Sequence, residues 1–232
     1  MKKTRVIIID DERTARDEVK RLLENYGDFE VIGEARNADE AKTLIELLQP
    51  DLLFLDIQMP EKSGFDLLES LDKVPLVIFI TAFDQYAVKA FEVSAIDYLM
   101  KPVREERFAK AVEQIKIRAT NVTAESQIFV KDQHQYHFIS WSKVYLIESL
   151  DNYARLYFDD KKVFIKSSLN QLEKKLEKGV FFRINRAQII NLHFIDKISI
   201  APEGRMNILL KTGAVFKVSE RQSVKLKNMG RT

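Results

Sequence analysis

The stretch LLFLDIQMP, residues 52–60, places one carboxylate, that of Asp56, directly after four apolar residues and shortly before Pro60. A run of four apolar residues suits a strand that is buried on both faces, as in a parallel sheet, and is too short for a core helix. An aspartate at the exit of such a strand lies at the carboxyl edge of the sheet, where open α/β folds bind ligands. On this stretch alone, a loop residue or a helix cap is an equally good interpretation of Asp56.

Apolar runs alternate with helical periodicities on both sides of this stretch. Strands are expected at 6–9, 29–35, 52–55, 76–81 and 97–100, and helices at 13–26, 37–48, 65–71, 87–93 and 105–118. A five-fold βα alternation predicts an α/β fold, a doubly wound, five-stranded parallel sheet with helices on both faces.

Polar side chains follow several of these strands. Asp10 and Asp11 close the first strand, Thr81 ends the fourth, and Lys101 follows the fifth. Because the carboxyl ends of parallel strands share one edge, these residues should converge on Asp56, and three close carboxylates require a neutralising cation. Oxygen-only ligands favour Mg²⁺, which suits phosphoryl transfer to Asp56 as the nucleophile, with Lys101 and Thr81 contacting the phosphoryl oxygens.

Residues 1–120 resemble the receiver domain of two-component response regulators. The resemblance is carried by IDD at 9–11, DIQMP at 56–60 followed by Gly64, TA at 81–82, DY at 97–98 and KP at 101–102. It implies that Asp56 accepts phosphate from the phosphohistidine of a sensor histidine kinase. It also implies that Asp11, Asp56 and the main-chain carbonyl of Gln58 hold Mg²⁺, with Asp10 acting mainly through water.

The same resemblance implies a switch made of Thr81 and Tyr98, in which the hydroxyl moves toward the phosphoryl group and the aromatic ring turns inward. It implies a cis bond between Lys101 and Pro102, and a homodimer that forms on activation through the fourth helix, fifth strand and fifth helix. The plainer alternatives make Thr81 and Tyr98 ordinary strand residues and Asp11 a helix cap.

Length and composition set the wider frame. A chain of 232 residues favours two domains, and the absence of cysteine suits a reducing cytoplasm. Neither a signal-peptide core nor an apolar run near 20 residues is present, so we expect a cytoplasmic protein without membrane contact. Residues 1–120 carry 18 Lys and Arg against 24 Asp and Glu, whereas residues 121–232 carry 19 against 11. This split favours a control or metal-binding module joined to a module that binds a polyanion.

The helical periodicity lapses at 121–126, which we interpret as a linker between domains at 1–120 and 127–232. Beyond it, eight short strands with turn signals predict a mostly β domain, with helices opened by Ser168 and Ser219. The expected strands lie at 127–131, 136–140, 144–147, 153–158, 162–165, 195–201, 206–210 and 215–218.

Enzyme motifs are missing from the second half, where His134, His137 and His193 are isolated and are interpreted as surface residues. Its distinctive segment is FFRINRAQIIN, residues 181–191, which sets arginine and asparagine between apolar anchors. Arginine can bond a guanine edge and asparagine an adenine edge, and either can bind phosphate, so double-stranded DNA is one candidate partner. A solvated loop is the alternative.

Residues 127–228 resemble the LytTR-type DNA-binding domain of LytR/AlgR regulators. The resemblance rests on ES at 148–149 with the turn DNY at 151–153, on the 181–191 segment, and on VSER at 218–221. The family commonly has His where this chain has Asn185 and Ser where it has Ala187. These two departures leave the domain assignment intact and concern only which bases are preferred. By position, the resemblance implies DNA contacts from Asn152, Tyr153, Arg155, Arg183, Asn185, Arg186 and Arg221, with a structural role as the alternative for Arg183.

The hypothesis is therefore a response regulator that controls transcription and is not a conventional enzyme. The alternative is a phosphorylation-dependent protein-interaction module whose basic half docks an acidic partner. A phosphatase of the haloacid dehalogenase type is disfavoured, because its two aspartates lie two residues apart after one strand and those of this chain do not.

Overall fold

The computed structural model describes residues 3–82, 97–121, 127–132, 135–201 and 204–229. The chain divides into two compact units, Met1–Trp141 and Ser142–Thr232. Within the described residues, no helix is long and apolar enough to cross a lipid bilayer.

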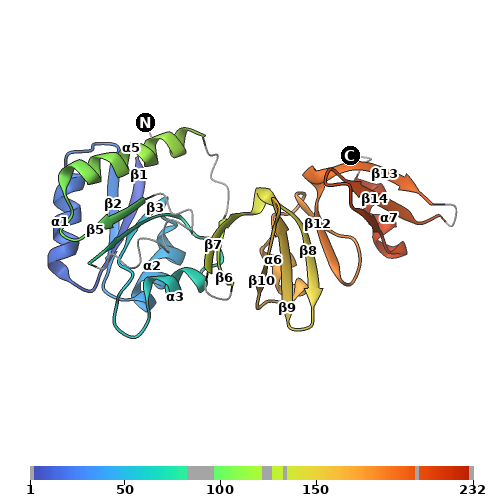
Figure 1. The fold of residues 1–232 in the computed structure, drawn as a ribbon, viewed down its shortest axis with the longest axis horizontal. Helices are drawn as coiled ribbons and strands as arrows, with labels where there is room; N and C mark the ends of the chain where they lie inside the picture. The colour runs from blue at the N-terminus through green and yellow to red at the C-terminus, as the bar shows by residue number, and fades with distance from the viewer. Residues whose placement is uncertain (1–2, 83–96, 122–126, 133–134, 202–203, 230–232) are drawn as a thin grey trace. The chain divides into compact units, whose positions relative to one another are not determined.

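The first unit contains the predicted five-stranded parallel sheet, in the order β2-β1-β3-β4-β5 (Figure 1). The predicted short helix at 87–93 lies outside the described residues. The elements are β1 (Thr4–Ile9), α1 (Arg13–Leu23), β2 (Phe29–Ala35), α2 (Ala38–Leu48), β3 (Leu52–Leu55), α3 (Gly64–Glu69), β4 (Leu76–Thr81), β5 (Asp97–Met100) and α5 (Glu105–Asn121).

The central strands are apolar at consecutive positions because both faces of the sheet are covered. Ile8 and Phe54 point to the face that packs with Phe108 of α5. Ile7 and Leu53 point to the opposite face, which packs with residues of α2 and α3. Figure 1 shows these two helix layers on either side of the sheet, so the doubly wound architecture is confirmed.

Local signals fix where the helices begin. The side chain of Asn37 accepts a hydrogen bond from the amide of Glu40 at 2.9 Å and caps α2, as its spacing predicts. The carboxylate of Glu40 accepts from the amide of Arg36, one residue before the cap. Ser168 and Gln171 form a complete capping box.

A two-stranded hairpin, β6 (Gln127–Asp132) and β7 (Gln135–Ser140), belongs to the first unit. The ring of Phe65 in α3 stacks on Phe129 of β6, with centroids 5.9 Å apart, and on Tyr136 of β7, with centroids 4.4 Å apart. A β-bridge joins Val74 to Gln127. The hairpin therefore extends the apolar core on the α3 side of the parallel sheet.

The second unit is mainly antiparallel β, as expected, with sheets in the orders β10-β9-β8-β12-β11 and β13-β14-β15. No strand was expected within 181–191, but this segment forms two short strands around a turn. The elements are η1 (Trp141–Lys143), β8 (Val144–Leu150), β9 (Tyr153–Phe158), β10 (Lys161–Ile165), α6 (Leu169–Lys175), β11 (Phe181–Arg183), β12 (Gln188–Asn191), η2 (Leu192–Phe194), β13 (Ile195–Ile200), β14 (Met206–Leu210), β15 (Val215–Lys217) and α7 (Glu220–Met229).

Candidate functional site

Three carboxylates meet at the carboxyl edge of the parallel sheet. Asp10 and Asp11 follow β1 and Asp56 follows β3, and one oxygen from each lies within 4.8 Å of the others. Asp10 and Asp56 are buried, whereas Asp11 is exposed. An oxygen-only cluster with one solvent-facing member fits a hard divalent ion such as Mg²⁺, which keeps water ligands.

Lys101 reaches this cluster from the end of β5. Its Nζ atom lies 2.7 Å from Oδ2 of Asp56 and 2.7 Å from Oδ2 of Asp10. The peptide bond from Lys101 to Pro102 is cis, as the resemblance implied. Three residues distant in sequence are thus in direct contact, which is the convergence that the strand ends predict.

The electrostatics of this pair of carboxylates depend on Lys101. Burial raises the pKa of Asp10, and the hydrogen bond from Lys101 opposes that rise. Burial disfavours the charged form of Lys101, but hydrogen bonds to Asp10 and Asp56 outweigh it, so the pKa of Lys101 is raised. Lys101 therefore remains an ammonium group that neutralises part of the acidic cluster.

The other residues predicted for this site are Thr81 on β4, Tyr98 on β5 and Gln58, which is two residues beyond Asp56. Thr81 is fully buried at the end of β4, and its Oγ1 has no hydrogen-bond partner among the described residues. Tyr98 is buried in β5, opposite Phe79 of β4. The amide of Gln58 donates to Oδ1 of Asp56 at 3.0 Å, and the Gln58 side chain is exposed.

Gly64 closes the loop after Asp56 from the other side. Its amide donates to the carbonyl of Ile57 at 2.8 Å. A Cβ atom at this position would lie 2.4 Å from the main-chain oxygen of Asp56, so only glycine fits without a shift of the backbone. The close approach explains why glycine follows the DIQMP motif.

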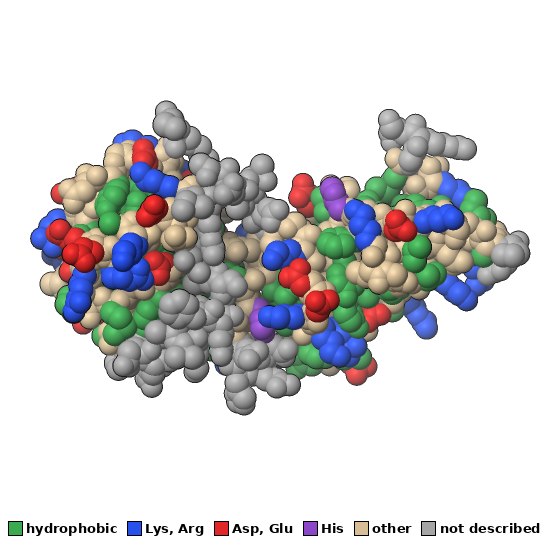
Figure 2. Space-filling view, turned by 45° about the horizontal axis from the view of Figure 1, so that its top comes forward, with side chains coloured by type: hydrophobic (Ala, Val, Ile, Leu, Met, Phe, Trp, Pro, Cys, Tyr) green, Lys and Arg blue, Asp and Glu red, His purple; other side chains and the backbone are tan. Residues whose placement is uncertain are grey.

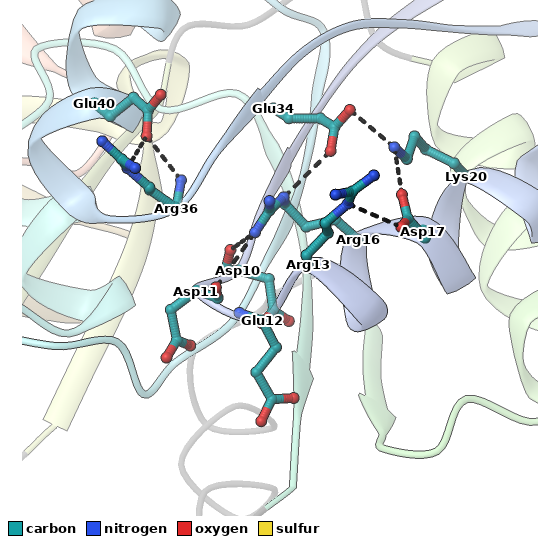
Figure 3. Close-up of polar contacts among 10 residues, drawn as sticks. All are labelled: Asp10, Asp11, Glu12, Arg13, Arg16, Asp17, Lys20, Glu34, Arg36 and Glu40. Carbon is teal, nitrogen blue, oxygen red and sulfur yellow. Dashed lines mark hydrogen bonds and ion pairs between the residues drawn. The ribbon is translucent and has the colours of Figure 1, made fainter.

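Arg16 also contacts this site, although no sequence motif predicted it. The guanidinium donates to the carbonyl oxygen of Asp10 at 2.7 Å (Figure 3). An arginine in the first turn of a helix that follows two aspartates is the only signal in the sequence, and most arginines at such positions are exposed.

In the second unit, two of the residues expected to contact DNA are at the tip of the β8–β9 hairpin. Asn152 and Tyr153 are exposed there. Arg155 lies further along β9 and is half-buried, with its guanidinium 4.9 Å from the ring centroid of Phe164 and a hydrogen bond to the hydroxyl of Tyr157. Arg155 is thus largely engaged within the unit.

A chain of hydrogen bonds joins Arg155 to Asn185 across three neighbouring strands. The Tyr157 hydroxyl, which accepts from Arg155, donates to Glu148 at 2.5 Å. Gln188 donates to the other oxygen of Glu148 at 2.8 Å and accepts from the Asn185 amide at 2.9 Å. Glu148 is therefore the shared acceptor between the β8–β9 strands and the 184–187 turn, a role that its place in the sequence did not predict.

Arg183 secures the turn that carries Asn185 and Arg186. Its guanidinium donates to the carbonyl oxygens of both residues, at 3.2 and 3.0 Å. It also pairs with Glu173 of α6 at 3.0 Å. These contacts give Arg183 a structural position, whereas Arg186 is exposed.

The start of α7 lies against the same turn. The amide of Ser219 donates to the carbonyl of Ile184 at 2.9 Å, and the Asn185 side chain donates to the carbonyl of Lys217. Arg221 follows in the first turn of α7 and is exposed. Side chains that are widely spaced in the sequence are thus brought onto the 184–187 turn and its neighbours.

Lys and Arg side chains recur over the face of this unit seen in Figure 2.

Two family models match the chain. Residues 6–113 match the response regulator receiver domain, and residues 134–231 match the LytTr DNA-binding domain. These spans cover most of both units.

Several relatives are similar to this chain over nearly its whole length and nearly the whole of their own. A response regulatory protein of Vibrio cholerae is 36% identical over 96% of this chain and 97% of its own. Transcriptional regulatory protein BtsR of Escherichia coli K12 is 33% identical over 96% and 97%, and sensory transduction protein LytT of Bacillus subtilis is 32% identical over 97% and 98%. By its two domain matches, its acidic site and these relatives, the chain belongs to the two-component response regulators that join a receiver domain to a LytTr DNA-binding domain and regulate transcription.

Proposed function

We propose that Asp56 is the phosphoacceptor of this regulator and that a sensor histidine kinase is its phosphodonor. The observation that carries this proposal is the contact of Asp56 with Lys101 beside Asp10 and Asp11, at one edge of the sheet. An Asp56 oxygen attacks the phosphorus in line, and the bond to the kinase histidine breaks with its electron pair going to the imidazole nitrogen.

Asp11, Asp56 and the carbonyl of Gln58 would hold Mg²⁺, with Asp10 acting through water. Bound there, Mg²⁺ shields the charge of the phosphoryl group. The hydrogen bond from the Gln58 amide to Asp56 Oδ1, at 3.0 Å, supports this arrangement because it holds the main chain of Gln58 close to the Asp56 carboxylate. Lys101 would turn from the carboxylates to a phosphoryl oxygen.

Thr81 and Tyr98 are the proposed switch. The unpartnered Oγ1 of Thr81 is a buried hydroxyl that a phosphoryl oxygen would satisfy. Movement of Thr81 toward Asp56 would be coupled to the inward position of Tyr98 on the neighbouring strand. Phosphorylation adds about −1.5 to −2 charges, which is the change that biases the two states.

For the second unit we propose recognition of double-stranded DNA by a homodimer, with one half-site for each copy. Asn152, Tyr153, Arg186 and Arg221 are the proposed contacts, since all four are exposed. Asn185 contributes to the same surface. Arg155 and Arg183 contribute through the hydrogen bonds that hold their neighbours.

The proposed domain division is a receiver domain at 1–120, a linker at 121–126 and a DNA-binding domain at 127–232. The matched spans 6–113 and 134–231 support it, although the hairpin at 127–140 packs with the first unit. A partner kinase and a DNA target also support a cytoplasmic location.

Phosphorylation is tested by incubating the protein with acetyl phosphate and Mg²⁺ and measuring its intact mass. The protein should gain one phosphoryl group, and Asp56→Ala should gain none. Asp39→Ala, which removes a surface carboxylate paired with Lys62, should behave as the parent does. A phosphoryl group that persists in Asp56→Ala contradicts the assignment.

DNA recognition is tested by selecting genomic fragments with the phosphorylated full-length protein. Paired sites should be enriched, and binding should weaken steeply with salt. Arg186→Ala and Arg221→Ala should weaken specific binding without changing phosphorylation. Uniform weak binding with no enriched sequence contradicts the proposal and favours a protein-interaction module.

A further inference from the structure

Arg16 lies between the metal-site loop and the neighbouring strand β2. Its side chain is 15% exposed, although it carries a full charge. The Nη1 atom donates to the carbonyl oxygen of Asp10 at 2.7 Å and lies 3.4 Å from that of Asp11. The Nε atom pairs with Oε2 of Glu34 at 3.2 Å (Figure 3).

These contacts hold the main chain from which two of the three carboxylates project. Asp10 and Asp11 are adjacent, and their side chains must both turn toward Asp56 to place their oxygens within 4.8 Å. The peptide carbonyls point to Arg16 instead, so the carboxylates and the carbonyls are separated on the two sides of the loop. A rotation of this main chain would move both carboxylates together.

Glu34 sets the direction of Arg16. One oxygen of Glu34 accepts from Arg16, and the other accepts from Lys20 at 3.0 Å. Lys20 pairs in turn with Asp17 at 2.6 Å, one turn along α1. The guanidinium is thus oriented by a carboxylate that is itself held on β2.

Only a forked cation satisfies this geometry. A guanidinium has several donors at fixed angles, which lets it reach carbonyl oxygens on one side and a carboxylate on the other. A lysine ammonium is a point charge on a flexible stem and would keep the charge of Arg16 without bridging both partners. The substitution Arg16→Lys therefore keeps the positive charge while removing the bridge between the carbonyl oxygens and Glu34.

We propose that Arg16, oriented by Glu34, is a positioning residue that presents Asp10 and Asp11 to the divalent ion. The inference rests on the proposed metal site. Outer residues that orient metal ligands typically contribute about 10- to 100-fold to metal affinity. A cation near the site opposes a bound dication, so a pure charge effect has the opposite sign.

The test is a titration of the full-length protein with Mn²⁺, in which free Mn²⁺ is measured by electron paramagnetic resonance. Arg16→Met and Arg16→Lys should both weaken Mn²⁺ binding about tenfold. Glu34→Gln, which leaves Arg16 in place, should weaken binding severalfold, and adding it to Arg16→Lys should cause little further loss. Thermal unfolding with chelator establishes that each variant is folded.

Arg13→Met is the matched control, because Arg13 lies on the same helix, is 85% exposed and contacts only Asp17 at 3.6 Å among the ion pairs of the described residues. It should bind Mn²⁺ as the parent does. Parent affinity in Arg16→Lys, or tighter binding in Arg16→Met, overturns the positioning role. If the parent itself binds no Mn²⁺, or binds it equally well after Asp11→Asn, the proposed metal site fails rather than the role of Arg16.

Discussion

The ammonium group of Lys101 bridges Asp56 and Asp10, at 2.7 Å from an oxygen of each. The three side chains are at most 14% exposed. Two buried carboxylates are thus held side by side by one cation. The ammonium group of Lys101 therefore supplies the positive charge that offsets the repulsion between these two carboxylates.

Lys101→Met should destabilise the first unit most strongly when chelator is present. Loss of one partner from a buried ion pair costs about 3 kcal/mol in free energy of unfolding, because the remaining charges are unpaired. Mg²⁺ should restore more stability to this variant than to the parent, since it neutralises the same carboxylates. Thermal unfolding with chelator and with Mg²⁺ measures both effects, and an equal Mg²⁺ response in the two proteins would contradict this account.

Gly64→Ala should lower both stability and the rate of phosphorylation. The added Cβ would meet the main-chain oxygen of Asp56 at 2.4 Å, and the backbone shift needed should cost about 1–3 kcal/mol. Gly27→Ala is the control, since a Cβ there meets nothing within 4 Å, and its effect should stay within about 0.5 kcal/mol. Chemical unfolding and acetyl phosphate kinetics provide the measurements. If Gly64→Ala lowered the free energy of unfolding as little as Gly27→Ala does, the loop after Asp56 would be shown to accommodate the added Cβ.

Phe129→Ala should destabilise the first unit by about 3–5 kcal/mol, because the ring is 5% exposed and stacks on Phe65. Leu47→Ala, at a side chain that is 75% exposed, should have little effect. The single tryptophan, Trp141, directly follows β7 and reports this transition by fluorescence. A Phe129→Ala protein that unfolds like the parent would mean that the hairpin adds nothing to the receiver core.

Tyr157→Phe should remove an alkaline pH dependence of stability. Burial, followed by the hydrogen bond to Glu148, raises the pKa of Tyr157 above its ordinary value of about 10. A raised pKa means that the stabilisation is fully present below about pH 10 and is lost as pH rises through the pKa of the folded protein. The difference in free energy of unfolding between parent and Tyr157→Phe should therefore shrink in that alkaline range.

The absorbance of tyrosinate checks the same assignment directly. Glu148→Gln should lower the pKa of Tyr157 toward its ordinary value, because the carboxylate that favours the neutral hydroxyl is gone. Tyr153→Phe, at an exposed ring, should leave the Tyr157 titration unchanged. An identical Tyr157 titration in the parent and in Glu148→Gln would rule out Glu148 as a cause.

Arg183→Ala and Arg186→Ala should differ in kind. Arg183 holds two carbonyl oxygens and Glu173, so its loss should cost about 2 kcal/mol of stability in the second unit. Arg186 is exposed, so its loss should leave the stability of the second unit unchanged. It should lower the slope of log binding constant against log salt concentration by about 1, because one phosphate contact is lost. Unfolding curves and salt titrations of DNA binding separate the two, and a normal stability for Arg183→Ala would make it a candidate contact instead.

The sequence predicted the first unit well because periodicity and strand ends are local signals. The runs at 29–35 and 52–55 became strands with those bounds, and Asp10, Asp11, Asp56 and Lys101 converged as expected. A parallel sheet makes this deduction strong, because its topology alone brings the strand ends to one edge.

The contacts of Arg16 and Glu148, and the packing of the hairpin on α3, escaped prediction for a different reason, although both strands of the hairpin were expected. The partners of Arg16 are peptide carbonyls and a glutamate on another strand, which no residue pattern specifies. Glu148 was noted only as part of a motif, since its bonds to Tyr157 and Gln188 depend on strand register. Long-range packing decides such contacts, so they become visible only in the folded chain.

The hairpin at 127–140 has a consequence for exchanging modules between regulators of this family. A junction placed in the polar stretch before Gln127 would leave the Phe65 ring with a foreign partner or with solvent. A junction placed after Trp141 would carry the native aromatic stack along with the receiver. Chimeras that keep β6 and β7 with their own α3 should therefore fold more reliably than chimeras cut at the apparent linker.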